Sequence, residues 1–339
     1  MTEQGAAPLP PLELAACLED WPLARPFSIA RGSKTAATVL GVSVTGGNAT
    51  GRGEGVPYAR YDETATGCLQ SVQSLTRCLA DGGLSAEQTL ARLPPGAARN
   101  ALDCALWDWR AKHTGHPVWR LADLPEPGPV QTAVTLSLDT PQAMAGEARR
   151  LARRHGLLKL KLGRPQEDAA RMAAIRAAAP DARLIVDANE GWTATTYPDL
   201  AAAAADQGVE LIEQPLPDGD DAVLAEIPPL VPVCADESFR AHSSLAAIAP
   251  RYQAVNVKLD KSGGFTPAIQ AISEARELGF RIMIGSMVAT SLGVAPALLL
   301  AGLADWADLD GPLLLARDRG HALECPDDRL YPPHADLWG

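Results

Sequence analysis

The second half of the chain repeats one pattern, in which a short apolar run ends in charged residues and a helix-like stretch follows. The clearest runs are LLKLKLG (157–163), LIVDAN (184–189), VELIEQP (209–215), VPVCADES (231–238) and AVNVKLD (254–260). Strands that are buried on both faces read as near-continuous apolar runs, and their alternation with helices is typical of parallel βαβ units. The pattern therefore predicts an α/β fold with a (β/α)8-type barrel.

Three of these runs end in an acid, namely Asp187, Glu213 and Asp236. In a (β/α)8 barrel the carboxyl ends of the strands meet at one mouth, where the active site lies. A single acid at such a position can simply cap the next helix, but three acids in register favour a shared function. Because Mg2+ is bound through carboxylate oxygens, the sequence predicts a Mg2+ site on these residues.

Lysines accompany the acids. Lys159 and Lys161 are two residues apart, so they share one face of a strand while leucines occupy the other. Lys258 shares its parity with Asn256 and Asp260, and we expect all three to face the barrel interior. A buried lysine needs a function or a counter-charge. For Lys159, a salt bridge to one of the acids is the alternative to a catalytic role.

A lysine that acts as a base must be neutral, so its pKa must fall from about 10.4 to roughly 7–8. Burial and nearby positive charge lower the pKa of a lysine, and a metal ion and a second lysine would supply that charge. Lys261 has the opposite parity to Lys258 and precedes Gly263-Gly264, which indicates a loop position.

Asp308 and Asp310 share one strand face at the expected end of the eighth strand. A polar strand edge before the Gly311-Pro312 turn is the simplest interpretation of the two acids by themselves. Opposite a metal site, however, two acids that are not needed as ligands predict a receptor for a substrate ammonium group.

The chain before the barrel has a different character. Residues 11–56 read as antiparallel strands with a glycine-rich turn region at Gly51, Gly53 and Gly55, and residues 62–82 and 86–113 read as helices. The Pro/Gly-rich stretch at 123–130 marks a domain boundary. We therefore divide the chain into an N-terminal α+β domain (1–125), a barrel domain (126–315) and a C-terminal segment (316–339).

Composition excludes some partners. A net charge of −11 argues against nucleic acid or an anionic membrane as the main partner. No apolar stretch approaches the length of a membrane span, and the N-terminus lacks the features of a signal peptide, so we expect a cytoplasmic protein. The six cysteines contain no C-x2-C pair and are expected to be reduced thiols. A homo-oligomer is compatible with the sequence, which does not select an oligomeric state.

Taken together, these motifs resemble the enolase superfamily, in its muconate-lactonising subgroup, and within it the dipeptide epimerases. The resemblance extends from about Trp21 to Leu315, and the N-terminal domain is similar to the α+β capping domain of that family. The D-x-D motif points to dipeptides, as in the alanyl-glutamate epimerases of peptidoglycan recycling. The matching motifs are K-x-K (159–161), D-A-N (187–189), E-Q-P (213–215), A-D-E-S (235–238), N-x-K (256–258) and D-L-D (308–310).

The resemblance implies a mechanism. Mg2+ on the three acids would hold the terminal carboxylate of a dipeptide and stabilise the enediolate that forms when the α-proton leaves. Lys161 and Lys258 would remove and return the proton from opposite faces, and Lys159 would add positive charge. Asp308 and Asp310 would bind the N-terminal ammonium group of the dipeptide.

Specificity for the substrate side chain is expected to come from a loop of the capping domain that covers the mouth. In the resembling family, members that act on acidic dipeptides often present a cation from this loop. Arg31 and Lys34, in PFSIARGSK, are both candidates here, and Ser286 is a candidate for the pocket wall.

Other activities remain open at this point. An N-acylamino acid racemase or an o-succinylbenzoate synthase would use the same lysines and metal, but its substrate lacks the free ammonium group. A Schiff-base aldolase could be built on a barrel lysine, yet it would not need three aligned acids. A non-catalytic binding protein of the same fold would not need every expected catalytic position to be filled.

Overall fold

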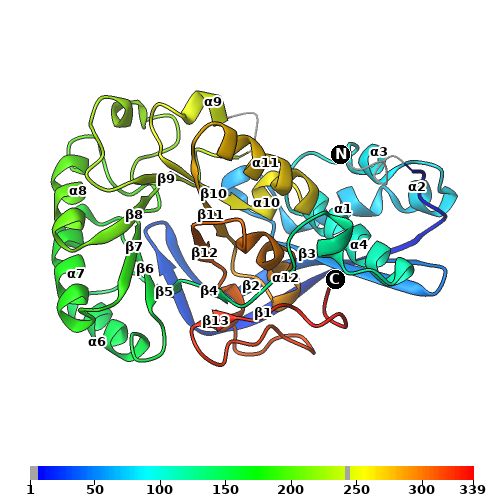
Figure 1. The fold of residues 1–339 in the computed structure, drawn as a ribbon, viewed down its shortest axis with the longest axis horizontal. Helices are drawn as coiled ribbons and strands as arrows, with labels where there is room; N and C mark the ends of the chain where they lie inside the picture. Colours follow the sequence, from blue (N-terminus) through cyan, green and yellow to red (C-terminus); the bar gives the residue numbers. More distant parts are fainter. Residues whose placement is uncertain (1–6, 241–244) are drawn as a thin grey trace.

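The computed structural model describes residues 7–240 and 245–339 and has two main parts, a parallel barrel and an antiparallel capping domain (Figure 1). Hydrogen bonds from Ala133 N to Ala307 O (2.8 Å) and from Leu309 N to Thr132 Oγ1 (2.9 Å) join the first and last strands of the barrel. The predicted (β/α)8-type fold is therefore confirmed. The eight parallel strands, in spatial order, are β5 (Val134–Leu136), β6 (Leu157–Lys161), β7 (Arg183–Asp187), β8 (Val209–Glu213), β9 (Val233–Ala235), β10 (Ala254–Lys258), β11 (Arg281–Gly285) and β12 (Trp306–Asp308).

Helices follow the strands and cover the outside of the barrel. Several begin at residues suited to a helix start: Thr140 caps α6 by accepting a hydrogen bond from Ala143 N, with Pro141 in the first turn. No helix in the described parts of the chain is long and apolar enough to cross a membrane. The helical segments are α6 (Pro141–Leu151), α7 (Pro165–Ala178), α8 (Tyr197–Asp206), η3 (Ala222–Ala225), α9 (Leu245–Ile248), α10 (Leu259–Ser262), α11 (Phe265–Glu277), α12 (Ser291–Ala301) and η5 (Gly311–Leu314).

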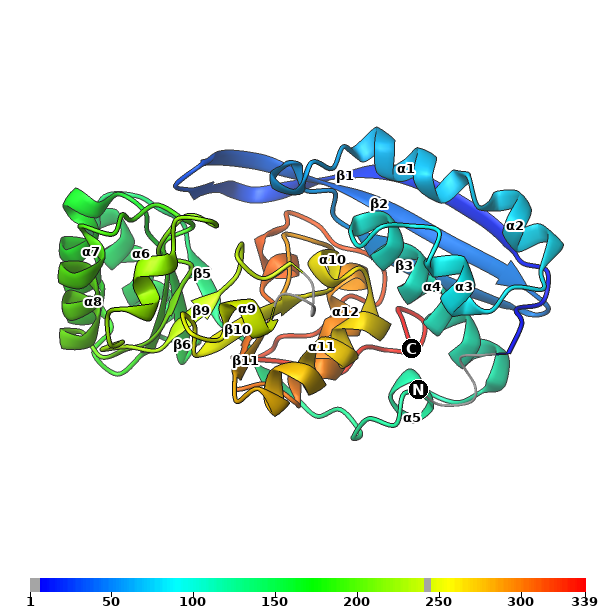
Figure 2. The same cartoon turned by 90° about the horizontal axis from the view of Figure 1, so that it is seen from above.

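The capping domain is an antiparallel sheet of β1 (Glu13–Ile29), β2 (Gly32–Gly46) and β3 (Ala49–Gly55), which is packed against helices. In Figure 2, β1 and β2 extend as a long hairpin from this domain toward the barrel. The two predicted helices are each broken, the second by Pro94-Pro95-Gly96, because proline and a glycine at φ 148° cannot continue a helix. The helical segments are η2 (Ala59–Tyr61), α1 (Ala65–Gln73), α2 (Thr76–Asp81), α3 (Ala86–Leu90), α4 (Ala97–Thr114) and α5 (Val118–Leu121).

The glycine-rich stretch before residue 56 is a strand and not the predicted turn region. Gly51, Gly53 and Gly55 lie at alternate positions of β3, so they face the same side, and that side packs on α4. A Cβ atom at Gly53 would lie 2.1 Å from the backbone oxygen of Ala101, and equivalent contacts occur at the other two glycines. Glycine is therefore required here for the close approach of strand and helix.

Buried polar contacts join the capping domain, the barrel and the C-terminal segment. Glu54, on β3, accepts hydrogen bonds from Thr290 N (2.8 Å) at the start of α12 and from Arg319 Nη2 (2.6 Å) in the C-terminal segment. Near the end of the chain, Trp338 Nε1 donates to the carbonyl oxygen of Cys104 (3.0 Å). The same segment contributes β13 (Arg329–Leu330), which pairs with β4 (Val130–Gln131) ahead of the barrel. These contacts fix the capping domain over one end of the barrel.

We expect Gly53→Ala to destabilise the protein by about 3 kcal/mol, because the added methyl group meets backbone atoms that cannot move independently. Gly146→Ala is the matched control, since a Cβ at this position in α6 meets nothing within 4 Å and alanine favours the helix. Thermal unfolding followed by circular dichroism measures both. Equal midpoints for the two variants would contradict the close strand–helix contact.

Candidate active site

Because side chains alternate between the two faces of a strand, the charged residues that face the barrel interior form a layer next to a layer of apolar side chains, here called the floor. The floor is one buried cluster to which every barrel strand, or the residue before it, contributes one side chain: Ala133, Leu157, Ile185, Leu211, Cys234, Ala254, Met283 and Trp306. Side chains two residues further along a strand point to the same side. The next layer is therefore formed by Thr135, Lys159, Asp187, Glu213, Asp236, Asn256, Gly285 and Asp308.

The three predicted metal ligands all lie in this layer. Asp187 and Glu213 are paired in register on β7 and β8, and Asp236 follows the next strand, β9. Burial, and then the negative charge of Asp187, raise the pKa of Glu213 to about 7. Burial also opposes ionisation of Asp187, but Lys161 and Lys159 hold the pKa of Asp187 below its usual range. Carboxylates that are buried together in this way stay ionised only if positive charge lies nearby.

The donor set fits a hard divalent cation. Asp187, Glu213 and Asp236 offer carboxylate oxygens at one end of the barrel, and all three side chains are buried. Within the described residues, Asn189 Oδ1 and Glu237 Oε2 are buried polar atoms without a hydrogen-bond partner, and both residues, with Asp236, line a cavity at the mouth of the barrel. Oxygen-only donors of this kind are typical of Mg2+ sites.

Lys159 lies among the acids. Its Nζ is 2.6 Å from Asp308 Oδ2 and 3.3 Å from Asp187 Oδ2, and it also contacts Glu213 Oε2. The salt bridge that was the alternative for Lys159 is therefore present. Burial opposes the charge on Lys159, but the surrounding carboxylates raise its pKa well above the usual value, so Lys159 stays protonated.

Lys161 and Lys258 approach the acids from separate strands, β6 and β10. Lys161 Nζ is 2.6 Å from Asp187 Oδ2, and Lys258 Nζ is 2.8 Å from Asp236 Oδ2. Although burial works against it, Asp236 and Glu213 raise the pKa of Lys258 well above its usual value. This shift is opposite to the one that a base requires. A cation bound by the same carboxylates would partly neutralise their negative charge, and the pKa of Lys258 would then fall.

Two predictions next to Lys258 are wrong. β10 ends at Lys258 and α10 begins at once, so the alternation of a strand does not extend to the following residues. Asp260 therefore turns toward the capping domain, where it accepts hydrogen bonds from Val56 N (2.9 Å) and Asn100 Nδ2 (2.8 Å). Lys261 is not a loop residue: it is buried in α10, and its Nζ is 2.6 Å from Asp236 Oδ1.

Asp308 and Asp310 both line the cavity, but they do not share a strand face, because β12 ends at Asp308. Asp310 instead precedes η5, and its Oδ2 accepts a hydrogen bond from Thr135 N (2.6 Å). Burial, and then the charge of Asp308, raise the pKa of Asp310 to about 6. Two neighbouring buried carboxylates of this kind favour the binding of a cationic group.

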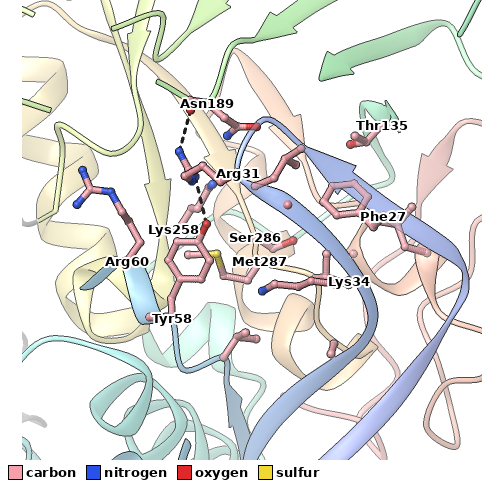
Figure 3. A pocket seen from close by; sticks show the side chains of 18 of the residues that line it. Phe27, Arg31, Lys34, Tyr58, Arg60, Thr135, Asn189, Lys258, Ser286 and Met287 are labelled. Carbon is pink, nitrogen blue, oxygen red and sulfur yellow. Dashed lines mark hydrogen bonds between the residues drawn. The ribbon is translucent and has the colours of Figure 1, made fainter. Parts of the chain in front are cut away.

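The hairpin of β1 and β2 brings Arg31 and Lys34 to a cavity of about 720 Å3 above the acids (Figure 3). Ser286, which follows β11, lines the same cavity. The Arg31 side chain donates from Nη2 to Glu237 Oε1 (2.7 Å) and from Nη1 to Asn189 O (2.8 Å). The structure thus brings Arg31, Lys34 and Ser286 to the mouth of the barrel.

Sequence reasoning missed several residues of the mouth. Glu237, Tyr58 and Arg60 line the cavity, and Glu190 bridges Arg31 and Arg60. Glu237 directly follows Asp236, and this position beside a predicted metal ligand was the one sequence feature that could have indicated a place in the site. Tyr58 and Glu190 lie in connections between elements and Arg60 lies in the short helix η2, so none of the three follows a strand period.

A closed parallel barrel, an antiparallel domain over its mouth, and carboxylates facing lysines inside it define a barrel enzyme of the enolase type. Residues 12–122 match the mandelate racemase / muconate lactonizing enzyme family, N-terminal domain, and residues 143–322 match the enolase C-terminal domain-like family. The chain belongs to the muconate-lactonising group of the enolase superfamily.

Two curated relatives are similar over most of their length. The L-Ala-D/L-Glu epimerase of Escherichia coli is 44% identical over 314 residues, which are 92% of this chain and 97% of the relative. An N-acetyl-D-glutamate racemase of a Pseudoalteromonas species is 43% identical over 293 residues, which are 85% of this chain and 91% of the relative. Both relatives are isomerases that invert a stereocentre.

Solved structures show the same fold with ligands. An enolase family member from Agrobacterium tumefaciens, crystallised with sodium and L-Ala-L-Glu, is 45% identical with a TM-score of 0.94, and the match covers 97% of this chain and 100% of that one. A dipeptide epimerase from Enterococcus faecalis, complexed with Mg and L-Leu-L-Tyr, is 26% identical with a TM-score of 0.88 over 96% of this chain and 98% of that one.

We expect Asp236→Asn to weaken Mg2+ binding at least tenfold, because one anionic oxygen ligand is lost. Isothermal titration calorimetry with Mg2+ or Mn2+ measures the effect. Asp199→Asn, on the exposed face of α8, is the control and should bind the ion as the wild type does. Unchanged affinity in Asp236→Asn would remove this residue from the ligand set.

Proposed function

We propose that this chain is a Mg2+-dependent epimerase that inverts the α-carbon of the C-terminal residue of a dipeptide, of the Ala-Glu type. The observation that carries the proposal is the position of Lys161 and Lys258. They reach the same carboxylate cluster from β6 and β10, with the cavity between them. Two bases on opposite sides of one carbon are what inversion by proton transfer requires.

We assign the metal-binding role to Asp187, Glu213 and Asp236. Mg2+ bound there would act as a Lewis acid toward the terminal carboxylate of the dipeptide. Lys161 and Lys258 would then exchange roles as base and acid, depending on which stereoisomer is bound. Lys159, which stays protonated among the acids, would stabilise the negative charge of the enediolate.

Asp308 and Asp310 support a dipeptide as the substrate. Both carboxylates line the cavity, and an N-terminal ammonium group would neutralise part of their charge. An N-acylated amino acid brings no positive charge to this position. The Ala-Glu relatives and the bound L-Ala-L-Glu of the Agrobacterium structure point the same way.

A second candidate is racemisation of an N-acylated glutamate, which the similarity to the N-acetyl-D-glutamate racemase favours. Both candidates share a glutamate at the reacting carbon, and both would use a cation near its side chain. A cytoplasmic role in peptidoglycan recycling depends on the dipeptide substrate and stays a prediction.

The proposal is tested by incubating the protein with Mg2+ and a dipeptide library in D2O, followed by mass spectrometry. We expect deuterium to enter at the α-carbon of the C-terminal residue, most rapidly for Ala-Glu, and expect a chelator to stop it. N-acetyl-glutamate is included as a separate substrate. Exchange with N-acetyl-glutamate alone would transfer the assignment to the racemase, and no exchange with any substrate would refute both.

We expect Lys161→Ala and Lys258→Ala each to lower kcat for epimerisation by roughly 10²–10⁴-fold, because one of the two proton-transfer groups is lost. Each variant should still exchange the α-proton of one stereoisomer, and the two variants should differ in which one. Proton nuclear magnetic resonance in D2O follows both processes. Arg77→Ala, an exposed cation of α2 in the capping domain, is the control; full epimerase activity in either active-site variant would refute the two-base assignment.

A further inference from the structure

We infer that Gln214 is a positioning residue that sets the relative places of the three carboxylates of the metal site, and that a buried hydrogen-bond chain from Asp221 orients its side chain. Gln214 follows Glu213 at the end of β8, and both its side chain and that of Asp221 are fully buried. This role rests on the metal site of the proposed function, and it requires no contact between Gln214 and the substrate.

The backbone of Gln214 bridges the segments at the ends of three neighbouring strands. Its N–H donates to Cys234 O on β9 (2.9 Å), and its carbonyl oxygen accepts a hydrogen bond from Glu190 N (2.9 Å), in the segment after β7. The three predicted metal ligands lie at, or directly after, the ends of β7, β8 and β9. One residue is therefore bonded to every strand end that carries a predicted ligand.

The side chain of Gln214 holds the segment that carries Asp236. Its Oε1 accepts hydrogen bonds from Asp236 N (2.9 Å) and from Ser238 N (3.0 Å). The backbone of the third ligand is thus tied to the residue that directly follows the second ligand, Glu213. Partners of this kind orient metal ligands from outside the coordination sphere, and their loss weakens metal binding.

The backbone of these segments is held in an uncommon conformation. Gln214 has φ 36°, and Asn189 and Glu190, which follow β7, have φ 45° and 67°. Residues other than glycine adopt the left-handed region infrequently, and such conformations persist where the surrounding contacts maintain them. The hydrogen bonds of Gln214 therefore maintain a chain direction that the isolated segment would not favour.

A chain of hydrogen bonds determines which way the Gln214 amide points. Asp221 pairs with Arg251, and an ionised carboxylate can only accept hydrogen bonds. The hydroxyl groups of Tyr252 (2.6 Å) and Ser238 (2.7 Å) therefore donate to Asp221 Oδ2. Each hydroxyl has one hydrogen, so its oxygen accepts from Gln214 Nε2, at 3.0 Å and 2.8 Å respectively. The amide oxygen is left to face the two backbone N–H groups.

The test measures the affinity for Mn2+ in the absence of substrate. Gln214→Met keeps the length of the side chain and removes its hydrogen bonds, and it should lower the affinity at least tenfold. Isothermal titration calorimetry measures the affinity. The electron paramagnetic resonance spectrum of the bound Mn2+ should also change, because the ligands are placed differently.

Asp108→Asn is the matched control. Asp108 is also a buried carboxylate paired with a cation, Lys112, but it belongs to α4 of the capping domain. Its replacement should lower the midpoint of thermal unfolding and leave both the Mn2+ affinity and the spectrum unchanged. The control therefore separates a loss of stability from a loss of ligand placement.

Asp221→Asn tests the hydrogen-bond chain while Gln214 stays in place. An amide at this position can donate to the two hydroxyl groups, so the Gln214 amide is no longer restricted to one orientation, and the Mn2+ affinity should fall severalfold. In the double variant with Gln214→Met, the loss should equal that of Gln214→Met alone. Losses that multiply would show that Asp221 acts independently and would overturn the chain.

Circular dichroism at the temperature of the titration identifies the folded variants. Unchanged Mn2+ affinity in folded Gln214→Met would overturn the inference, as would an equal loss in Asp108→Asn; if Gln214→Met is unfolded, unchanged affinity in Asp221→Asn overturns it. A wild type that binds Mn2+ but exchanges no α-proton would refute the proposed function and leave the role of Gln214 intact. A wild type without affinity for Mn2+ would overturn both.

Discussion

The concentration of carboxylates inside the barrel constrains the rest of the structure. Asp187, Glu213 and Asp236 are removed from water, and buried charges are unfavourable unless they are paired. Strand alternation places Lys159 in the same layer, where it contacts Asp187 and Glu213. The acids stabilise the charge of the lysines, and the lysines stabilise the charge of the acids. A divalent cation bound to the acids would stabilise their negative charge and would reduce the stabilisation that they give to the protonated lysines. Metal binding is therefore expected to lower the pKa values of the lysines.

The capping domain must be fixed over the mouth for this site to select a substrate. β3 approaches α4 so closely that only glycine fits at Gly53, and Glu54 joins the same strand to Thr290 of the barrel and to Arg319 of the C-terminal segment. The β1–β2 hairpin is therefore anchored far from its tip. At the tip, Arg31 makes the second attachment, and the hairpin can present a side chain to the cavity in a defined position.

The same inner layer could serve either of the two candidate reactions. An epimerase of a dipeptide and a racemase of an N-acetylated amino acid resemble this chain to nearly the same degree, 44% and 43%. Overall identity therefore does not distinguish their substrates. Both reactions need a proton to be removed and returned at one carbon, which the lysines and acids of the inner layer can provide. In our proposal the groups that would distinguish the substrates are Asp308, which lies in the inner layer beside Lys159, Asp310 just beyond it, and the hairpin cations at the mouth.

The sequence by itself determined the barrel and its inner layer, because a period of two fixes which side chains of a buried strand face inward. That rule failed where the strand stopped. Asp260 and Lys261 follow the last residue of β10 and belong to a helix, in which successive side chains turn by about 100°, so parity could not place them. Only the tertiary structure showed that Arg31 contacts the segments that follow β7 and β9. Two partners of Arg31, Asn189 and Glu237, are 158 and 206 residues away in the chain, and a local sequence pattern cannot predict contacts between loops that only the folded barrel brings together.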